Sequence, residues 1–241
     1  MIPWLDRHTP FPGVAKALRH PNGLLAAGGD LSIDRLLTAY RNGIFPWYSE
    51  GDPLLWWSPD PRMVLFTDEF KVSRSLAKSI RNRGYEVRID TAFGRVLEGC
   101  AGPRRDQPGT WLGSEMREAY LRLHQLGYAH SFETWHEGTL AGGLYGMAIG
   151  RMFYGESMFS RSVDASKVAL AGLVRELHAR GLPMIDCQMN TGHLASLGAR
   201  EIRRDDFVLR VRALVNYAEP PGAWEITDRN ARRQDEAQCH D

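Results

Sequence analysis

The order of elements expected in the second half of the chain restricts its fold more than any other feature of the sequence. Three segments have strand composition and are separated by turns short enough to favour antiparallel pairing. A long segment with apolar residues at helical spacing follows and ends at Gly181. We expect three strands over 129–135, 139–147 and 151–157, followed by a helix over about 164–180. A strand over 183–188, a short helix over 191–199 and a last strand over 200–207 complete the series.

Antiparallel strands followed by a helix, a strand and a short helix form the order of a GNAT-like acyltransferase core. A CoA-dependent enzyme of that kind needs consecutive backbone N–H groups at the start of its main helix to hold a pyrophosphate, and this loop is usually rich in glycine. The corresponding residues here, 157–167, include no glycine. The sequence therefore predicts a GNAT-like fold with a donor other than CoA, and a CoA-dependent N-acetyltransferase is kept as the alternative function.

The first half of the chain is more irregular. Residues 1–31 are rich in Pro and Gly and are expected to form an arm with one short strand, followed by a helix that Ser32 caps. In the next segment, 44–62, four prolines exclude a central strand or a long helix. Its Trp56 and Trp57 either fill a core or line a pocket.

The expected fold class is α+β, with a GNAT-like C-terminal acyltransferase core and a smaller α/β N-terminal domain. A strand is expected over 85–90, and two further helices over 92–101 and from the cap Ser114 to Gly127. The N-terminal domain is expected to consist of an arm, a helix and a Trp/Pro-rich loop over 1–62 and to be completed by residues 63–110. The GNAT-like domain is expected over 111–225, and a disordered tail over 226–241.

A local basic run is the strongest charge feature of the chain. Residues 71–88 carry six Lys or Arg against one Glu, and Arg74, Lys78 and Arg81 share one side of the expected helix. Such a run is often only a solvated face, but the acids that would balance it are missing. Because the net charge is only +1, any contact with a nucleic-acid backbone has to come from a patch of this kind.

Other global features exclude several classes. Three widely spaced cysteines and eight histidines show no metal-ligand spacing and no disulfide framework, so neither a metal nor a disulfide is expected. No basic start followed by an apolar run opens the sequence, and no stretch of eighteen apolar residues occurs. The expected location is the cytoplasm.

Two strand segments carry carboxylates among apolar residues. If alternation holds, Glu156 and Met158 share one face of their strand and Ser157 lies on the other. In the same way Asp186 and Gln188 share a face. Buried polar groups need partners, so each pair is either a structural network or part of a reaction centre, and the residues alone leave both open.

Ten motifs resemble, in order and at near-constant spacing, the leucyl/phenylalanyl-tRNA–protein transferase family. They are PNGLLAAGGDLS (21–32), GIFPWY (43–48), LLWWSPDPR (54–62), GTW (109–111), AYLRLHQLGYAHSFETW (119–135), GGLYG (142–146), GESMFSR (155–161), ASKVAL (165–170), IDCQ (185–188) and SLGA (196–199). The resemblance implies transfer of Leu or Phe from an aminoacyl-tRNA to the N-terminal amine of proteins that begin with Arg or Lys, marking them for degradation in an N-degron pathway. It implies no metal or cofactor. The protein is expected to act as a monomer. A tRNA-binding module without catalysis is a further alternative.

The resemblance also implies a set of site residues. The polar centre would be Asp186 and Gln188, which orient the attacking amine or take its proton, with Glu156 binding the acceptor or the ammonium group of the substrate. Leucines stand at 144, 173 and 177 where the family pattern predicts Met or Phe. The aromatics holding the terminal adenosine and acceptor would be Tyr40, Trp47, Trp111 and Tyr120; the apolar pocket Leu144, Met158, Leu170, Leu173, Leu177 and Ile185; and the tRNA surface Arg74, Lys78 and Arg81.

Overall fold

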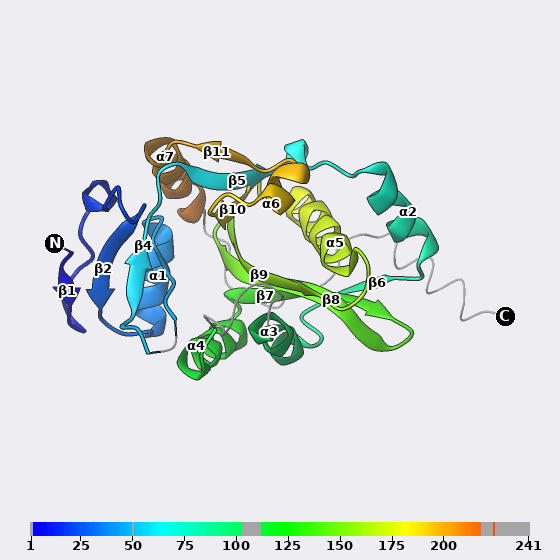
Figure 1. Cartoon of the computed structure of the whole chain (residues 1–241), viewed down its shortest axis with the longest axis horizontal. Helices are drawn as coiled ribbons and strands as arrows, with labels where there is room; N and C mark the ends of the chain where they lie inside the picture. The colour runs from blue at the N-terminus through cyan, green and yellow to red at the C-terminus, as the bar shows by residue number, and fades with distance from the viewer. Residues whose placement is uncertain (1, 50, 103–111, 218–223, 225–241) are drawn as a thin grey trace.

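Two sheets of different size organise the computed structural model, which describes residues 2–49, 51–102, 112–217 and 224. The smaller sheet has the strand order β1-β2-β4-β3 and the larger one the order β11-β5-β10-β9-β8-β7-β6. In Figure 1 the smaller sheet and α1 lie at one end of the molecule, beside the larger sheet with its covering helices. The structure is therefore of the α+β class, as expected.

The smaller sheet is built from very short strands. Its elements are β1 (Trp4–Leu5), a 3-10 turn (Val14–Lys16), β2 (Leu24–Gly28), α1 (Ile33–Arg41), β3 (Phe45–Pro46) and β4 (Leu55–Trp57). The expectation that no central strand would form here was wrong, because β4 lies between β2 and β3. The three residues of β4 fit between Pro53 and Pro59, and Pro46 lies in the edge strand β3, where a proline is tolerated. Trp56 and Trp57 are buried, which confirms the core interpretation for both.

The larger sheet contains the expected series. Its elements are β5 (Arg62–Phe66), β6 (Glu86–Ile89), β7 (Ala129–His136), β8 (Thr139–Ile149), β9 (Met152–Ser160), β10 (Met184–Gln188) and β11 (Arg200–Ile202). The three strands β7, β8 and β9 pair antiparallel, as predicted, and β10 runs parallel to β9. On the other side of β10, β5 pairs antiparallel with both β10 and β11.

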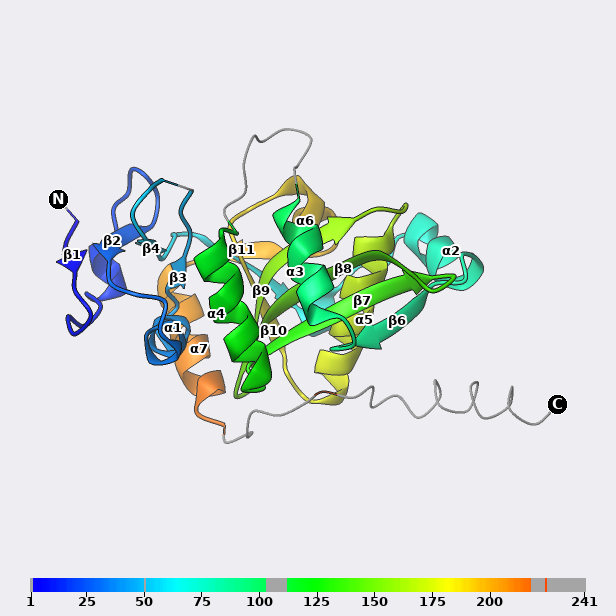
Figure 2. The same ribbon diagram turned by 90° about the horizontal axis from the view of Figure 1, so that it is seen from below.

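Helices cover both faces of the larger sheet. They are α2 (Arg74–Asn82), α3 (Phe93–Ala101), α4 (Ser114–Gln125), α5 (Ala165–Ala179), α6 (Gly192–Ser196) and α7 (Arg204–Val215), with a 3-10 turn at Thr67–Glu69. Figures 1 and 2 show α5 on one face and α3 and α4 on the other. Ser114 is the first residue of α4 and Gly113 its N-cap, so the expected serine cap is displaced by one residue.

Two expectations about element boundaries are corrected by the structure. Residues 63–110 were expected to complete the N-terminal domain, but β5 and β6 pair with strands of the larger sheet. The last strand was expected to run to Phe207, but it ends at Ile202 and α7 begins at Arg204. Phe207 and Val211 are buried at helical spacing, and tertiary packing of that face determines the helix.

The buried side chains form two clusters, one on each face of the larger sheet. One cluster joins the smaller sheet to α3, α4 and α7, and the other lies under α5. Trp224 stacks on His130 in the second cluster at a ring distance of 4.2 Å, whereas the expected tail 226–241 lies outside the described residues. Within the described ranges, no helix is both long and apolar enough to span a bilayer, and no group of three or more His, Cys, Asp or Glu could hold a metal.

Candidate active site

A cavity of about 110 Å³ lies between the first half of α5 and the strands β8, β9 and β10. Five of the six residues expected to form an apolar pocket line it, namely Leu144, Met158, Leu170, Leu173 and Ile185. Leu177 does not line the cavity: it is fully buried in the same core. The reason is distance, because Leu177 lies four residues after Leu173 and a helix rises about 6 Å over four residues.

Several cavity residues were missed in the sequence. Tyr145 and Gly155 belong to the strands already assigned to the site, whereas Leu194 comes from the five-residue helix α6. A helix of that length carries no periodic signal that would identify its inward face. Cys187 and Ser157 were assigned to the opposite faces of their strands, and the structure brings both to the cavity wall.

A β-bulge at Glu156 explains the position of Ser157. Tyr145 pairs with Ser157, but the next residue of β8, Gly146, pairs with Gly155, so Glu156 is the extra residue of β9. The bulge breaks the strict alternation of side chains that was expected for this strand. As a result Glu156, Ser157 and Met158 all line the cavity.

A second bulge separates Asp186 from Gln188. Asp186 pairs with Val64 and Gln188 pairs with Met63, which leaves Cys187 as the extra residue of β10. Gln188 has a positive φ of 62°, a conformation uncommon for residues other than glycine. The expectation that Asp186 and Gln188 share a face is therefore corrected: Gln188 lines the cavity and Asp186 does not.

Asp186 instead forms a buried ion pair with Arg62 of β5. Nε and Nη2 of Arg62 donate to Oδ1 and Oδ2 at 2.8 and 2.6 Å, and Nη1 donates to the backbone oxygen of Gly43 at 3.2 Å. The guanidinium also lies over the rings of Phe45 and Phe207, 4.7 and 4.6 Å from their centroids. Both charged side chains are fully buried.

Arg62 was not among the residues expected at the site, although it ends the WWSPDPR motif. The available signal was a lone Arg at the start of the apolar segment RMVLF, which needs a buried anion as partner. In the structure this ion pair joins three parts of the chain, the Gly43 turn, β5 and β10. The Asp186 carboxylate also accepts a hydrogen bond from the backbone N–H of Gln188 at 2.9 Å, and so holds the bulge beside the cavity.

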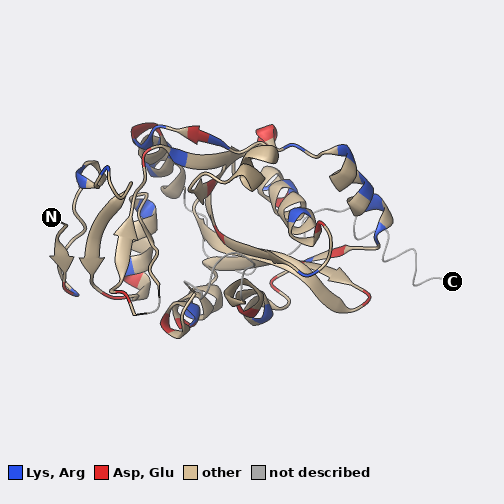
Figure 3. Ribbon diagram, viewed as in Figure 1, with Lys and Arg blue, Asp and Glu red and all other residues tan. Residues whose placement is uncertain are grey.

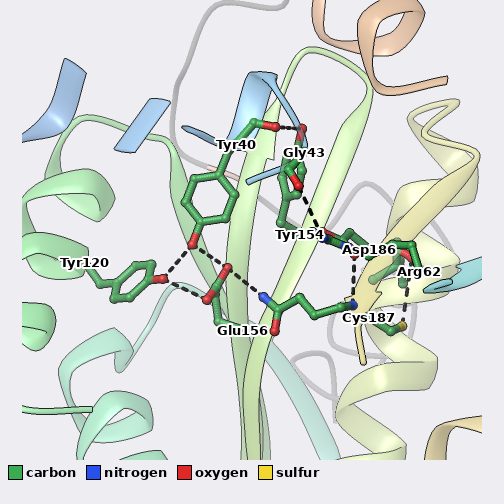
Figure 4. A network of polar contacts seen from close by, with 10 residues as sticks. Tyr40, Gly43, Arg62, Tyr120, Tyr154, Glu156, Asp186 and Cys187 are labelled. Atoms are coloured by element: carbon green, nitrogen blue, oxygen red, sulfur yellow. Dashed lines mark hydrogen bonds and ion pairs between the residues drawn. The ribbon is translucent and has the colours of Figure 1, made fainter. Parts of the chain in front are cut away.

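Glu156 is surrounded by hydroxyl groups from two helices (Figure 4). The Tyr40 hydroxyl of α1 donates to Oε1 at 2.7 Å, and the Tyr120 hydroxyl of α4 donates to Oε2 at 2.7 Å. The two hydroxyl oxygens are 2.6 Å apart. Nε2 of Gln188 donates to Oε1 at 3.4 Å, which links this cluster to β10.

Burial dominates the electrostatics of the site. It raises the pKa of Glu156 from an ordinary 4.5 to about 7, although the hydrogen bonds from Tyr40 and Tyr120 oppose that shift. Burial also raises the pKa of both tyrosines well above the ordinary value, and the nearby Glu156 carboxylate adds to this shift. The pKa of Cys187 is raised for the same first reason, so its thiol stays protonated.

The expected aromatic residues lie in different surroundings. Trp47 is 38% exposed and meets Trp57 edge-on at a ring distance of 5.6 Å. The rings of Tyr40 and Tyr120 are fully buried, so only their hydroxyls face the polar cluster. Trp111 lies outside the described residues. Contact of these residues with a terminal adenosine stays a prediction.

The expected basic helix is present as α2. Arg74, Lys78 and Arg81 are exposed, the helix contains no acidic residue, and Figure 3 shows its blue positions at the end of the molecule far from the smaller sheet. Ser73 caps the helix by accepting from the N–H of Leu76 at 3.2 Å. Whether this face binds RNA stays a prediction.

Comparisons with known proteins identify the family. A model of the leucyl/phenylalanyl-tRNA protein transferase family matches residues 64–212, and a model of the N-terminal domain of that family matches residues 29–60. The chain is 64% identical to the leucyl/phenylalanyl-tRNA–protein transferase of Chromobacterium violaceum over 93% of this chain and 97% of that protein. It is 60% identical to the protein of the same name from Nitrosospira multiformis, over 93% and 97% of the two chains.

Among solved structures, similarity is more distant. The structure of L-PGS from Bacillus licheniformis is 14% identical with a TM-score of 0.37, covering 71% of this chain and 57% of that chain. A GCN5-related N-acetyltransferase from Kribbella flavida is 10% identical with a TM-score of 0.35, covering 68% and 59%.

The fold, the small cavity and the curated relatives together place this chain among the acyl-transferring enzymes, as a transferase with an α+β core. More specifically, the chain belongs to the leucyl/phenylalanyl-tRNA protein transferase family.

Proposed function

We propose that this enzyme transfers Leu or Phe from an aminoacyl-tRNA to the N-terminal α-amine of proteins that begin with Arg or Lys, which marks those proteins for degradation. The observation that carries the proposal is the cavity beside α5, with apolar walls and with Glu156 and Gln188 among its lining residues. The specificity for Arg and Lys acceptors and the N-degron role are supported by membership of the family, and action as a monomer is part of the proposal.

The size and lining of the cavity favour one apolar amino-acid side chain. Its volume of about 110 Å³ is comparable with the ~150 Å³ of an engineered apolar cavity that binds benzene. Burying a Leu or Phe side chain in such a site stabilises the complex by about 1.5–3 kcal/mol relative to leaving it in water. A charged side chain would lose its hydration without gaining a partner on the Leu144, Leu170 and Leu173 walls.

The reaction needs positioning more than strong chemical assistance. An aminoacyl ester is already activated, and an α-amine with a pKa near ~8 is partly neutral at neutral pH. Holding the amine and the ester carbonyl in contact supplies much of the rate. The Gln188 amide can donate a hydrogen bond to the carbonyl oxygen as negative charge develops there.

Asp186 acts in this proposal as a positioning residue rather than as a base. Its carboxylate is occupied by Arg62 through two hydrogen bonds and does not line the cavity. Through the N–H of Gln188 it holds the bulge that presents the Gln188 side chain. Of the two roles implied by the family resemblance, orientation therefore fits better than proton transfer.

The tRNA backbone would lie along α2. Arg74, Lys78 and Arg81 are exposed cations on a helix without acids, and none of them forms a salt bridge with an acid among the described residues. Phosphate groups would take the place of the missing counter-ions.

A transfer assay tests the proposal directly. The full chain is incubated with radiolabelled Leu-tRNA and with a peptide that begins with Arg, and label should appear on the peptide. A peptide of the same sequence that begins with Gly should stay unlabelled. Label on neither peptide would contradict the proposal, and labelling by radioactive acetyl-CoA would favour the N-acetyltransferase alternative. Sedimentation at the assay concentration tests whether the protein is a monomer.

A further inference from the structure

Three short oxygen–oxygen contacts join the side chains of Tyr40, Tyr120 and Glu156 to one another. Tyr40 Oη lies 2.7 Å from Oε1 of Glu156, Tyr120 Oη lies 2.7 Å from Oε2, and the two hydroxyl oxygens lie 2.6 Å apart. Each distance is that of an O–H···O hydrogen bond, for which about 2.5–3.0 Å is normal. Each contact therefore requires one hydrogen atom between its two oxygens.

Two tyrosine hydroxyls supply only two hydrogens for these three contacts. If Glu156 is ionised and accepts from both tyrosines, the contact between Tyr40 and Tyr120 contains no hydrogen, and two lone-pair oxygens face each other at 2.6 Å. If the carboxyl group is protonated, the count is correct. The carboxyl donates to one tyrosine, that tyrosine donates to the other, and the second tyrosine donates to the remaining carboxyl oxygen.

We propose that Tyr40, Tyr120 and Glu156 form a closed ring of hydrogen bonds that stores one proton, and that Glu156 is the general acid of the transfer reaction. The proposal rests on the proposed function and assigns to Glu156 a catalytic role in place of ammonium binding, because a neutral carboxyl forms no ion pair. Its place fits this role, since the bulge in β9 puts Glu156 in the wall of the cavity, beside Gln188.

Burial and the neighbouring Asp186 carboxylate favour the neutral form of Glu156, whereas the hydrogen bonds from Tyr40, Tyr120 and Gln188 favour the ionised form. Tyr40 comes from α1, Tyr120 from α4, and Tyr145 of β8 packs edge-on against Tyr120 at 5.1 Å. The Asp186 carboxylate of β10 disfavours a second negative charge, and Arg62 of β5 is already engaged by Asp186. The raised pKa of Glu156, about 7, agrees with the count of hydrogens.

Glu156 alone can account for both proton transfers of the reaction. The neutral α-amine attacks the ester carbonyl, so that the new C–N bond leaves a positive charge on nitrogen and a negative charge on oxygen. As the bond from carbon to the ribose oxygen breaks, Glu156 gives its proton to that leaving oxygen. The carboxylate then takes the surplus proton from the nitrogen of the new amide, and the ring is restored.

Glu156→Gln separates proton transfer from structure. The amide N–H can donate to one tyrosine and the amide oxygen can accept from the other, so this variant keeps three hydrogens for three contacts but has no proton to exchange. We expect kcat to fall about 100-fold with the affinity for aminoacyl-tRNA unchanged. As pH increases, the kcat of the wild-type enzyme should first rise, because the acceptor amine loses its proton, and then fall, because Glu156 loses its own. The kcat of the variant should show only the rise.

The matched control is Glu176→Gln, which makes the same change at a buried glutamate of α5 that pairs with Arg180 at 2.6 Å and does not line the cavity. It should keep the kcat and the pH profile of the wild type. A Glu156→Gln enzyme with full kcat, or with equal losses in kcat and in tRNA affinity, would overturn the proposal.

An infrared measurement distinguishes failure of this inference from failure of the proposed function. Below the pKa of Glu156, the difference spectrum between the wild type and Glu156→Gln should contain the C=O stretch of a protonated carboxyl group, in the absence of any substrate. If the wild type shows this band but transfers no amino acid, the proposed function fails and the ring stands. If the wild type transfers Leu and shows no such band, the ring is wrong.

Discussion

Arg62 and Asp186, which are 124 positions apart in the sequence, meet through two charge-assisted hydrogen bonds of 2.8 and 2.6 Å with no exposure of either side chain. Neither residue lines the cavity, yet Asp186 binds the backbone of Gln188, which does. The pair therefore connects the first strand of the larger sheet to the polar side of the proposed active site.

Arg62→Met should destabilise the fold strongly. The change leaves the Asp186 carboxylate buried without its partner, and breaking a buried pair in this way costs about 3–5 kcal/mol. Urea denaturation measures the loss. Arg122→Ala, which breaks the exposed pair with Glu118, is the control and should leave the midpoint almost unchanged. A loss for Arg62→Met no larger than that of the control would contradict the role given to the pair.

Asp186→Ala should lower turnover far more than it weakens the binding of aminoacyl-tRNA, because it frees the Gln188 bulge without altering the apolar walls or α2. Turnover and tRNA affinity are measured at a temperature where the variant is folded. The double variant Arg62→Met/Asp186→Leu should recover stability, since two apolar groups replace the ion pair, but should not recover turnover. Equal losses of turnover and affinity in Asp186→Ala would exclude a role at the reaction centre.

Leu173→Ala and Leu177→Ala form a matched pair on α5. Both side chains are buried in the same core, so each substitution should cost about 2–5 kcal/mol. Only Leu173 lines the cavity. The ratio of Phe to Leu transfer should therefore rise in Leu173→Ala and stay at the wild-type value in Leu177→Ala. An equal change of the ratio in both variants would show that the cavity is not the side-chain pocket.

Neutralising Arg74 and Lys78 together should weaken binding of all tRNAs alike. Each lost phosphate contact should lower the slope of log affinity against log salt by about 1. Arg212→Ala, which removes an exposed charge from α7, is the control. Unchanged affinity of the double variant at low salt would place the tRNA on another surface.

Stability should depend on pH through Glu156. The folded state holds this proton up to a pKa of about 7, whereas the unfolded chain releases it near 4.5, so the folded state binds more protons between these values. The free energy of unfolding therefore falls as pH rises through that window. Relative to Glu156→Gln, the wild type should lose about 2 kcal/mol between pH ~5 and pH ~8. A constant difference between the two proteins would contradict the raised pKa.

The order of strands and helices from β7 to α6 can be predicted from the sequence, because their apolar periodicities of two and of 3.6 are local properties. Glu156, Gln188 and most of the apolar residues that line the cavity were also predicted from the sequence, because the motifs around them are specific. The last helix was missed because the preceding strand was expected to continue to Phe207, whereas packing of Phe207 and Val211 on one helical face decides the form of α7.

The partners and surroundings of the polar residues, in contrast, depend on tertiary contacts. One extra residue in β9 and one in β10 reverse the faces that alternation predicts, and such bulges depend on the pairing of a strand with its neighbour rather than on its own sequence. The partners Arg62 for Asp186 and Tyr40 for Glu156 come from 124 and 116 positions away, where no local pattern reaches. The sequence supplied the chemical groups, and burial with long-range pairing determined which of them carry charge and which hold a proton.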